Sequence, residues 1–470
     1  MRQISSFVFL ATIALNARAQ NPASPFDLNY SRESRAAIGA HHICSGLWVV
    51  GRVYKRSAEE ILAQDVAPFR LFSWEKDFKY DVDSQHHVVT VRGDGIPSRT
   101  ARYNGDQGCA IMPRGETEIH FKPVPVPRNL PDPVTQPWPM GDRDATTSFP
   151  DVKADVVTAA LDWGMAQKEQ NTRAIVFVYR GKIIGERYAP GWTKDTPEIS
   201  WSEGKSITAA LVGILVGQGV LKLDDFAPVK EWQTPGDPRG QIRIRNLMNM
   251  SSGLDFANRS LSGPESYTRE NKHMRVYFDG INIFDHSVNN AQAVPPNTRW
   301  RYQNSDPLTL GKIVREKVEA RGENYLTFPQ RALFDRIGIR NAVLEADAWG
   351  NFIMSGFDYL SARDWARFGL LHLHDGVWQG QRILPEGWTT FISTPAPADP
   401  SHGYGGLFWI NRGHAWAGVP EDAYRSDGAM GQYTMIVPSR DVVIVRMGPS
   451  PGDSGRYFAE LSKRLLESLP

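Results

Sequence analysis

Strand-like patterns lie at the two ends of residues 149–470, and helix-like patterns fill the stretch between them. Two early apolar runs, 174–179 and 182–187, are separated by a turn at Gly181 and predict an antiparallel hairpin. Late strand patterns follow at 407–411, 433–437 and 442–447. Helices are expected at 152–167, 364–373 and 456–469. This order predicts an α/β (α+β) domain whose single antiparallel sheet is built from both ends and interrupted by a helical insertion.

The first third of the chain divides into three shorter parts. Residues 1–19 combine a basic start, an apolar stretch and Ala17-Arg18-Ala19, which predicts a signal peptide that is removed after Ala19. Residues 20–122 mix short alternating runs with Gly, Asp and Asn turns, and they predict a small β-rich N-terminal unit. Residues 123–148 are dense in Pro, which excludes regular helix and sheet interior and indicates a linker or surface strap.

Charge and hydropathy limit the cellular compartments and the binding partners that we expect for the mature protein. The 53 basic and 52 acidic residues nearly cancel, which argues against a nucleic-acid partner. No segment after the signal peptide is apolar enough to span a membrane, so we expect a periplasmic or secreted protein without a membrane anchor. An oxidising compartment would favour a disulfide between the two cysteines, Cys44 and Cys109. The sequence leaves the oligomeric state open.

Ser202 and Lys205 form an S-x-x-K pattern directly before an apolar run, 207–215, that predicts a buried helix. Residues i and i+3 share a helix face with Cβ atoms about 5–6 Å apart, so the lysine can reach the serine hydroxyl. A serine nucleophile needs such a base, and burial near a helix N-terminus favours the neutral lysine that can act as one. A second S-x-x-K at 73–76 lies in a strand and turn pattern, where i and i+3 face opposite sides. The alternative for Ser202 is a helix cap, which would not require Lys205.

Two further motifs carry candidate functional residues. Tyr302 and Asn304 form a Y-x-N pattern; the tyrosine could relay protons, and the amide could orient the lysine or bind a substrate carbonyl. Ordinary core packing is the alternative for Tyr302.

The second of these motifs is Ser426-Asp427-Gly428, which precedes Ala429 and a strong strand pattern. Its glycine could let a substrate backbone approach the strand edge. The N–H groups of Ala429 and Ser202 could then form an oxyanion hole. The alternative is a plain hairpin turn.

The order of these three motifs resembles that of the penicillin-recognising serine hydrolases. The chain is similar to the branch that holds class C β-lactamases, D,D-peptidases, esterases and 6-aminohexanoate-dimer hydrolases. Further similar stretches are 242–256, 295–304 and 360–388, and the resemblance covers about 147–469. It implies a β-lactamase-like fold for residues 149–470.

The resemblance also implies a role for each candidate residue. Ser202 would be acylated, Lys205 would be its base, Tyr302 would shuttle protons, and Asn304 would position one of its neighbours. The N–H groups of Ser202 and Ala429 would hold the oxyanion. No cofactor and no metal site is expected, because no cluster of His, Cys, Asp or Glu has ligand spacing.

The third motif departs from the family pattern, which is Lys-Thr-Gly or His-x-Gly. Ser426 replaces the cation, and Asp427 would repel the carboxylate of a β-lactam or peptide end. Arg425 is adjacent, but on a strand it should point away from Ser426. We therefore expect hydrolysis of a small ester or amide, with a weak β-lactamase or D,D-peptidase as one alternative. A non-catalytic ligand-binding relative is another alternative, and a third is an N-terminal unit that carries the function itself.

Overall fold

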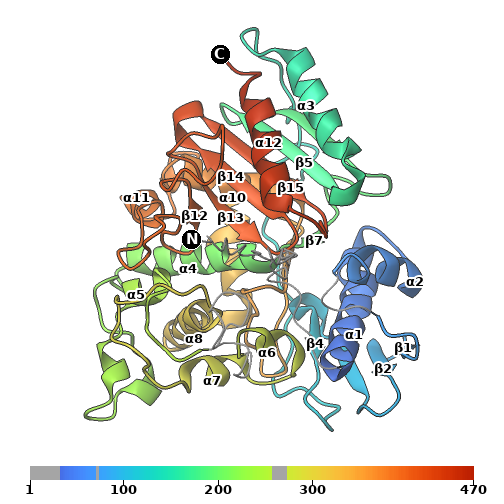
Figure 1. Ribbon diagram of the computed structural model, residues 1–470, viewed down its shortest axis with the longest axis vertical. Coiled ribbons are helices and arrows are strands. Elements are labelled where there is room, and N and C mark those ends of the chain that lie inside the picture. The colour runs from blue at the N-terminus through green and yellow to red at the C-terminus, as the bar shows by residue number, and fades with distance from the viewer. Residues whose placement is uncertain (1–31, 70–73, 257–271) are drawn as a thin grey trace, which may run out of the picture.

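The structure is a computed structural model that describes residues 32–69, 74–256 and 272–470. The signal peptide predicted for residues 1–19 and the serine of the second S-x-x-K pattern lie outside these ranges. A smaller N-terminal part lies beside a larger part that holds the main sheet and most of the helices (Figure 1). Among the described residues, no helix is both long enough and apolar enough to cross a membrane.

A six-stranded antiparallel sheet forms the centre of the larger part. In spatial order its strands are β12 (Trp409–Ile410), β13 (Tyr424–Gly428), β14 (Gln432–Val437), β15 (Val442–Met447), β5 (Ala174–Tyr179) and β6 (Lys182–Tyr188). β15 pairs with β5 along its whole length, so strands from the two ends of the domain meet in the middle of the sheet. The Val- and Ile-rich sequences of these two strands fit their complete burial. The sheet predicted from both ends of the domain is confirmed.

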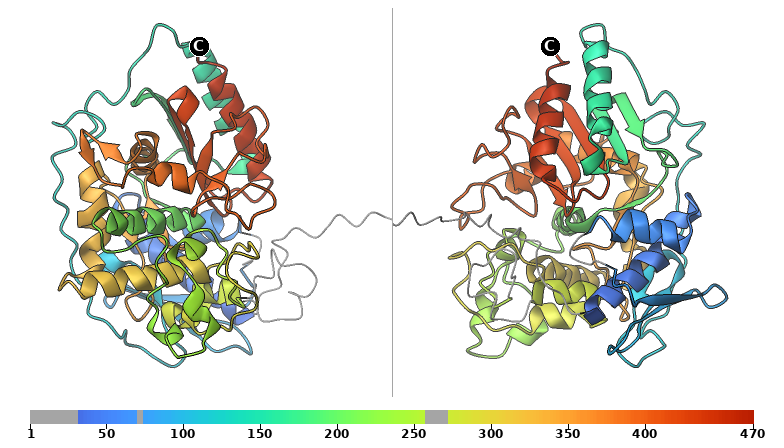
Figure 2. Two further views of the ribbon diagram at one scale, coloured as in Figure 1. Left: turned by 90° about the vertical axis from the view of Figure 1, so that its left-hand side faces the viewer. Right: turned by 45° about the vertical axis from the view of Figure 1, so that its right-hand side comes forward.

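Helices cover both faces of this sheet. On one face α3 (Ala154–Ala166) and α12 (Ser454–Leu466) lie side by side (Figure 2). On the other face α10 (Ala362–Leu373) packs closely, and a Cβ at its Gly369 would lie 2.5 Å from Val443 Cγ1.

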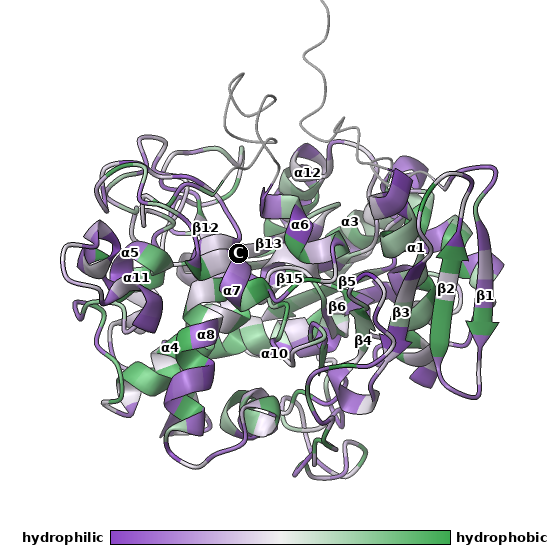
Figure 3. Cartoon of the chain, turned by 90° about the horizontal axis from the view of Figure 1, so that it is seen from below, coloured by the Kyte–Doolittle hydropathy of each residue, from purple (hydrophilic) through white to green (hydrophobic). Residues whose placement is uncertain are grey.

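The helical insertion lies between β6 and β12 in the chain. Its central helix α4 (Gly204–Gly217) is buried from Gly204 to Leu215 and is largely apolar (Figure 3). It packs on α8 (Ser305–Glu319). The shorter elements of this part are α5 (Ile244–Met248), α6 (Lys272–Phe278), α7 (Ile283–Val288), α9 (Asp335–Ile337), α11 (Trp388–Ile392), β7 (Glu198–Ile199), β8 (Val343–Leu344), β9 (Asp358–Leu360), β10 (Val377–Trp378) and β11 (Gln381–Arg382).

The N-terminal part combines α1 (Arg32–Trp48) and α2 (Ala58–Ile61) with a four-stranded antiparallel sheet. The strands are β1 (Lys79–Asp83), β2 (Val88–Arg92), β3 (Arg99–Tyr103) and β4 (Cys109–Ile111). A disulfide joins Cys44 of α1 to Cys109 of β4. We expected a β-rich unit here, and the helix α1 was not predicted. That helix is buried continuously from Ala36 to Gly46, so it lacks the single apolar stripe that reveals a surface helix.

Residues 123–148 have no helix and no strand longer than one residue. They run along the outside of the larger part (Figure 2). Trp138 Nε1 donates to Gly181 O at 2.9 Å, and Arg367 Nε donates to Pro139 O at 2.7 Å. Side-chain hydrogen bonds of this kind hold a segment in which Pro interrupts backbone pairing.

Candidate active site

Ser202 lies in the short turn Trp201–Glu203, which leads directly into α4. Lys205 lies in the first turn of α4, and its Nζ donates to Ser202 Oγ at 2.8 Å. Trp201 has φ of +50°, in the left-handed region that bulky residues rarely adopt. The backbone therefore turns sharply just before Ser202 and brings its hydroxyl onto the Lys205 amine.

Lys205 is buried, with 1% of its surface exposed. Its Nζ also donates to the backbone oxygen of Ser355 at 3.1 Å. Burial lowers the pKa of Lys205 to about 7, because an ammonium loses its hydration there, and the carboxyl of Asp358 offsets part of this. Near neutral pH a large share of Lys205 is thus an uncharged amine, which can accept a proton from Ser202.

Two tyrosines lie at Ser202. The Tyr302 ring faces Lys205, whose Nζ is 4.9 Å from the ring centroid. Burial raises the pKa of Tyr302 well above its usual value, and a hydrogen bond with Ser202 offsets part of this rise. Burial also raises the pKa of Tyr277, and a hydrogen bond with Ser202 is among the contacts that oppose it. Tyr277 lies on α6 and belongs to no motif, so nothing in the sequence singles it out.

Asn304 is fully buried and forms hydrogen bonds with residues of α6. Its Nδ2 donates to His273 O at 2.8 Å and to Tyr277 Oη at 3.0 Å. Its backbone N donates to His273 Nδ1 at 3.1 Å. Its Oδ1 has no hydrogen-bond partner within the described part of the chain. In the structure the amide nitrogen of Asn304 thus contacts α6 and the second tyrosine. The expected roles of this amide, orienting Lys205 or binding a substrate carbonyl, stay predictions.

The third motif turns its polar side chains in opposite directions. Ser426 Oγ donates to Glu203 Oε1 at 2.9 Å, under α4. Asp427 Oδ2 accepts from Arg425 Nη2 at 2.7 Å, so these two charges neutralise each other on the opposite face of β13. Arg425 points away from Ser426, as expected. This ion pair weakens the repulsion ascribed to Asp427.

Glu203 is a further buried group that sequence reasoning missed, although it lies inside the S-x-x-K motif. Burial raises its pKa well above its usual value, and the neighbouring Thr434 and the hydrogen bond from Ser426 oppose this. Burial thus disfavours the charged form of Glu203, whose carboxyl is bound to Ser426, the residue that replaces the cation of the family pattern.

Gly428 is required by the protein's own backbone. A Cβ there would lie 2.0 Å from Ser200 O, so no other residue fits without displacing the turn that carries Ser202. This differs from the expected role of admitting a substrate. The same contact places Ala429, the next residue, beside the Ser202 turn. The oxyanion hole expected from the N–H groups of Ser202 and Ala429 stays a prediction.

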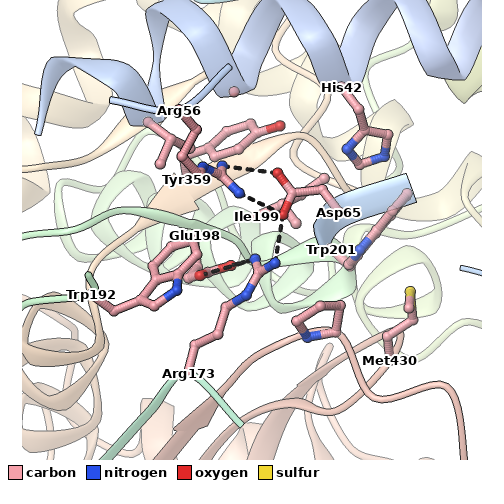
Figure 4. A pocket seen from close by; sticks show the side chains of 13 residues that line it. His42, Arg56, Asp65, Arg173, Trp192, Glu198, Ile199, Trp201, Tyr359 and Met430 are labelled. Carbon is pink, nitrogen blue, oxygen red and sulfur yellow. Dashed lines mark hydrogen bonds and ion pairs between the residues drawn. The ribbon is translucent and has the colours of Figure 1, made fainter. Parts of the chain in front are cut away.

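A buried ionic cluster lies behind this turn (Figure 4). Asp65, in the N-terminal part, accepts from Arg56 Nη2 at 2.9 Å and from Arg173 Nη2 at 2.6 Å. Arg173, just before β5, also donates to Glu198 Oε2 at 2.9 Å. The cluster borders a cavity of about 20 Å³, which Trp201 also lines and which has room for about one water. The N-terminal part thus reaches the back of the Ser202 turn.

Comparison with known proteins gives consistent matches. The family model described as Beta-lactamase matches residues 157–456. The 6-aminohexanoate-dimer hydrolase of Paenarthrobacter ureafaciens is 24% identical over 341 residues, which is 68% of this chain and 84% of that protein. A solved Bacillus anthracis structure, thought to be a 6-aminohexanoate-dimer hydrolase, matches with a TM-score of 0.55 and 23% identity over 70% of this chain and 88% of its own. A penicillin-binding protein homologue from Caulobacter crescentus matches with a TM-score of 0.53 and 14% identity over 67% and 97%.

Proposed function

The chain belongs to the beta-lactamase family and is a serine hydrolase of that family, and we propose that it cleaves an ester or amide bond through an acyl-enzyme on Ser202. The observation that carries this proposal is the 2.8 Å contact between Lys205 Nζ and Ser202 Oγ at the start of α4. A serine hydroxyl becomes an effective nucleophile when a neutral base accepts its proton. The pKa of about 7 for Lys205 supplies that base at neutral pH.

Acylation then proceeds in two steps. Lys205 takes the Ser202 proton as Oγ forms a bond to the substrate carbonyl carbon, and the carbonyl oxygen becomes an oxyanion. The backbone N–H groups of Ser202 and Ala429 hold this oxyanion. The bond to the leaving alcohol or amine breaks, and the leaving group takes a proton that passes from the Lys205 ammonium through Tyr302. Attack by water on the acyl-enzyme releases the acid and restores Ser202.

The third motif favours a substrate without a carboxylate at this end of the site. Ser426 replaces the family's cation and is bound to Glu203. Arg425 is paired with Asp427 and its guanidinium carbon lies 4.2 Å from the centroid of the Trp416 ring. An amide of a short linear acid and amine, as in 6-aminohexanoate oligomers, is the leading candidate. Weak β-lactam hydrolysis is the second.

Export of the protein completes the proposal. Removal of residues 1–19 would release the chain to the periplasm or the medium. The Cys44–Cys109 disulfide supports this location, since disulfides persist in oxidising compartments.

The test is turnover of p-nitrophenyl esters, nitrocefin and short amide oligomers, combined with labelling by a fluorophosphonate. We expect Ser202→Ala to abolish both turnover and labelling. Ser206→Ala is the matched control, because Ser206 lies on the same helix and its Oγ donates to Leu407 O at 2.9 Å. Turnover that survives in Ser202→Ala would refute the mechanism. If the wild-type protein is folded but the fluorophosphonate never labels Ser202, a non-catalytic binding role would be supported instead.

A further inference from the structure

The second tyrosine at Ser202 has a hydrogen-bonding pattern unlike that of Tyr302. Tyr277 is buried, with 4% of its surface exposed, and its Oη donates to Ser355 O at 2.5 Å. The same oxygen accepts from Asn304 Nδ2 at 3.0 Å. A phenol has one proton to donate, so the Tyr277 proton is committed to a backbone carbonyl. Tyr277 is therefore poorly suited to relay protons.

Three side chains converge on that one carbonyl. Ser355 O accepts from Tyr277 Oη at 2.5 Å, from Lys205 Nζ at 3.1 Å and from Ser202 Oγ at 3.4 Å. A carbonyl oxygen has two lone pairs, so three donors compete for it. The Tyr277 bond is the shortest, and it leaves the other two donors in longer contacts.

We propose that Tyr277 is a positioning residue of the acylation site, which occupies the Ser355 carbonyl and so directs Lys205 and Ser202 toward each other. This inference rests on the proposed function of Ser202 and Lys205. Without the Tyr277 hydroxyl, the carbonyl would be free to accept more strongly from a Lys205 ammonium. That contact favours the charged form of the lysine, which cannot take the Ser202 proton.

The protein holds Tyr277 from two sides. Its ring meets Trp201 edge-on at 5.8 Å between centroids, next to the nucleophile. The following residue, Phe278, offers its carbonyl to Arg99 Nη2 at 3.1 Å, and Arg99 belongs to β3 of the N-terminal part. Gly280 then passes so close to this part that a Cβ would lie 2.5 Å from Met112 O. The N-terminal part thus takes a share in positioning the second tyrosine.

The test compares the pH dependence of kcat/KM for a p-nitrophenyl ester in the full-length wild type and in Tyr277→Phe. The titratable groups that face Lys205 in the described structure are Asp358 on β9, His273 on α6 and Tyr302 before α8. The substitution replaces none of these residues, and it removes the small contribution of Tyr277 to the raised pKa of Tyr302. In the variant the Lys205 ammonium can bind the Ser355 carbonyl more strongly, which raises the pKa of Lys205. We therefore expect the acid limb of the profile, where kcat/KM falls because Lys205 becomes protonated, to move to higher pH by about half a unit or more. We also expect the plateau to fall several-fold.

Tyr457→Phe is the matched control. Tyr457 on α12 is also buried, and its Oη also donates to a backbone carbonyl, Gly164 O at 2.9 Å, away from the site. An acid limb that stays in place in Tyr277→Phe, or that moves equally in Tyr457→Phe, would overturn the positioning role.

Two further measurements keep the outcome decisive. If turnover of Tyr277→Phe is too slow, the rate of fluorophosphonate labelling against pH replaces it. If that variant does not fold, Asn304→Ala, which removes the donor to Tyr277 Oη, should move the limb in the same direction; an unmoved limb counts against the proposal. A wild type without an acid limb would refute the role of Lys205 instead, so the two failures are distinguishable.

Discussion

The buried ionic cluster behind the Ser202 turn contains two acidic residues whose pKa values are shifted in opposite directions. Burial opposes ionisation of Asp65, but Arg173 and Arg56 outweigh it and lower its pKa from 3.8 to about 2. Burial raises the pKa of Glu198 from 4.5 to about 6, and Arg173 offsets only part of this. Asp65 therefore stabilises the folded state as a carboxylate, whereas Glu198 is ionised at a cost.

The magnitudes follow from linkage between ionisation and folding. The lowered pKa of Asp65 corresponds to about 2 kcal/mol of stabilisation, present above pH 3.8 and lost as the pH falls toward 2. The raised pKa of Glu198 corresponds to a cost of about 2 kcal/mol above pH 6, which disappears as the pH falls to 4.5. Asp65→Asn also leaves two buried guanidinium groups short of a partner, and its total cost is about 2–5 kcal/mol. Glu198→Gln should be close to neutral at pH 7.

The assay is thermal unfolding of the wild type and both isosteric variants, followed by circular dichroism at pH 7 and pH 4.5. We expect Asp65→Asn to lower the unfolding midpoint by several degrees at both pH values. Glu198→Gln should match or exceed the wild type at pH 7 and lose that advantage at pH 4.5. Equal midpoints for Asp65→Asn and wild type, or equal losses in the two variants, would refute this account of the cluster.

Three shorter predictions concern the site and its frame. With a pKa of about 7 for Lys205, kcat/KM at pH 6 should be roughly tenfold below its alkaline plateau, and a profile that is flat between pH 5 and 9 would contradict this. Gly428→Ala should abolish activity and lower the unfolding midpoint, because its Cβ would lie 2.0 Å from a backbone oxygen; Gly217→Ala, with 3.6 Å of clearance, should leave both unchanged. Replacing Cys44 and Cys109 by Ser should lower the free energy of unfolding by about 4 kcal/mol, given the separation of 65 residues, and a double variant as stable as the oxidised wild type would exclude this role.

The main sheet and the S-x-x-K helix could be predicted because each is encoded by a local pattern. The strands β5 and β15 are short runs rich in Val, Ile and Phe that are bounded by turns. Such runs are typical of buried strands. The Ser202–Lys205 contact follows from helix geometry alone once α4 is recognised. Motif order then supplied Tyr302 and the Gly428 turn.

The features that were missed depend on tertiary contacts. α1 is buried on all sides between the N-terminal sheet and the larger part, so its sequence has no polar face to mark a helix. Tyr277 is held at Ser202 by tertiary contacts, among them the hydrogen bond from Asn304, 27 residues further along the chain. Strand alternation places Arg425 and Asp427 on the same face of β13, opposite Ser426. That the two side chains pair there is a contact that alternation alone does not give.

Arg173 constrains the evolution of this chain, because it links the two parts of the structure. It lies in the part that matches the family model, but one of its two carboxylate partners, Asp65, lies outside it. Loss of the N-terminal part would leave Arg173 with Glu198 as its remaining carboxylate partner, and loss of Arg173 would leave Asp65 with Arg56 as its remaining guanidinium partner. Each loss removes one contact of a buried charge and so costs stability. A chimera that joins the N-terminal part to a relative's catalytic domain should therefore be more stable when the relative carries an arginine at the position of Arg173.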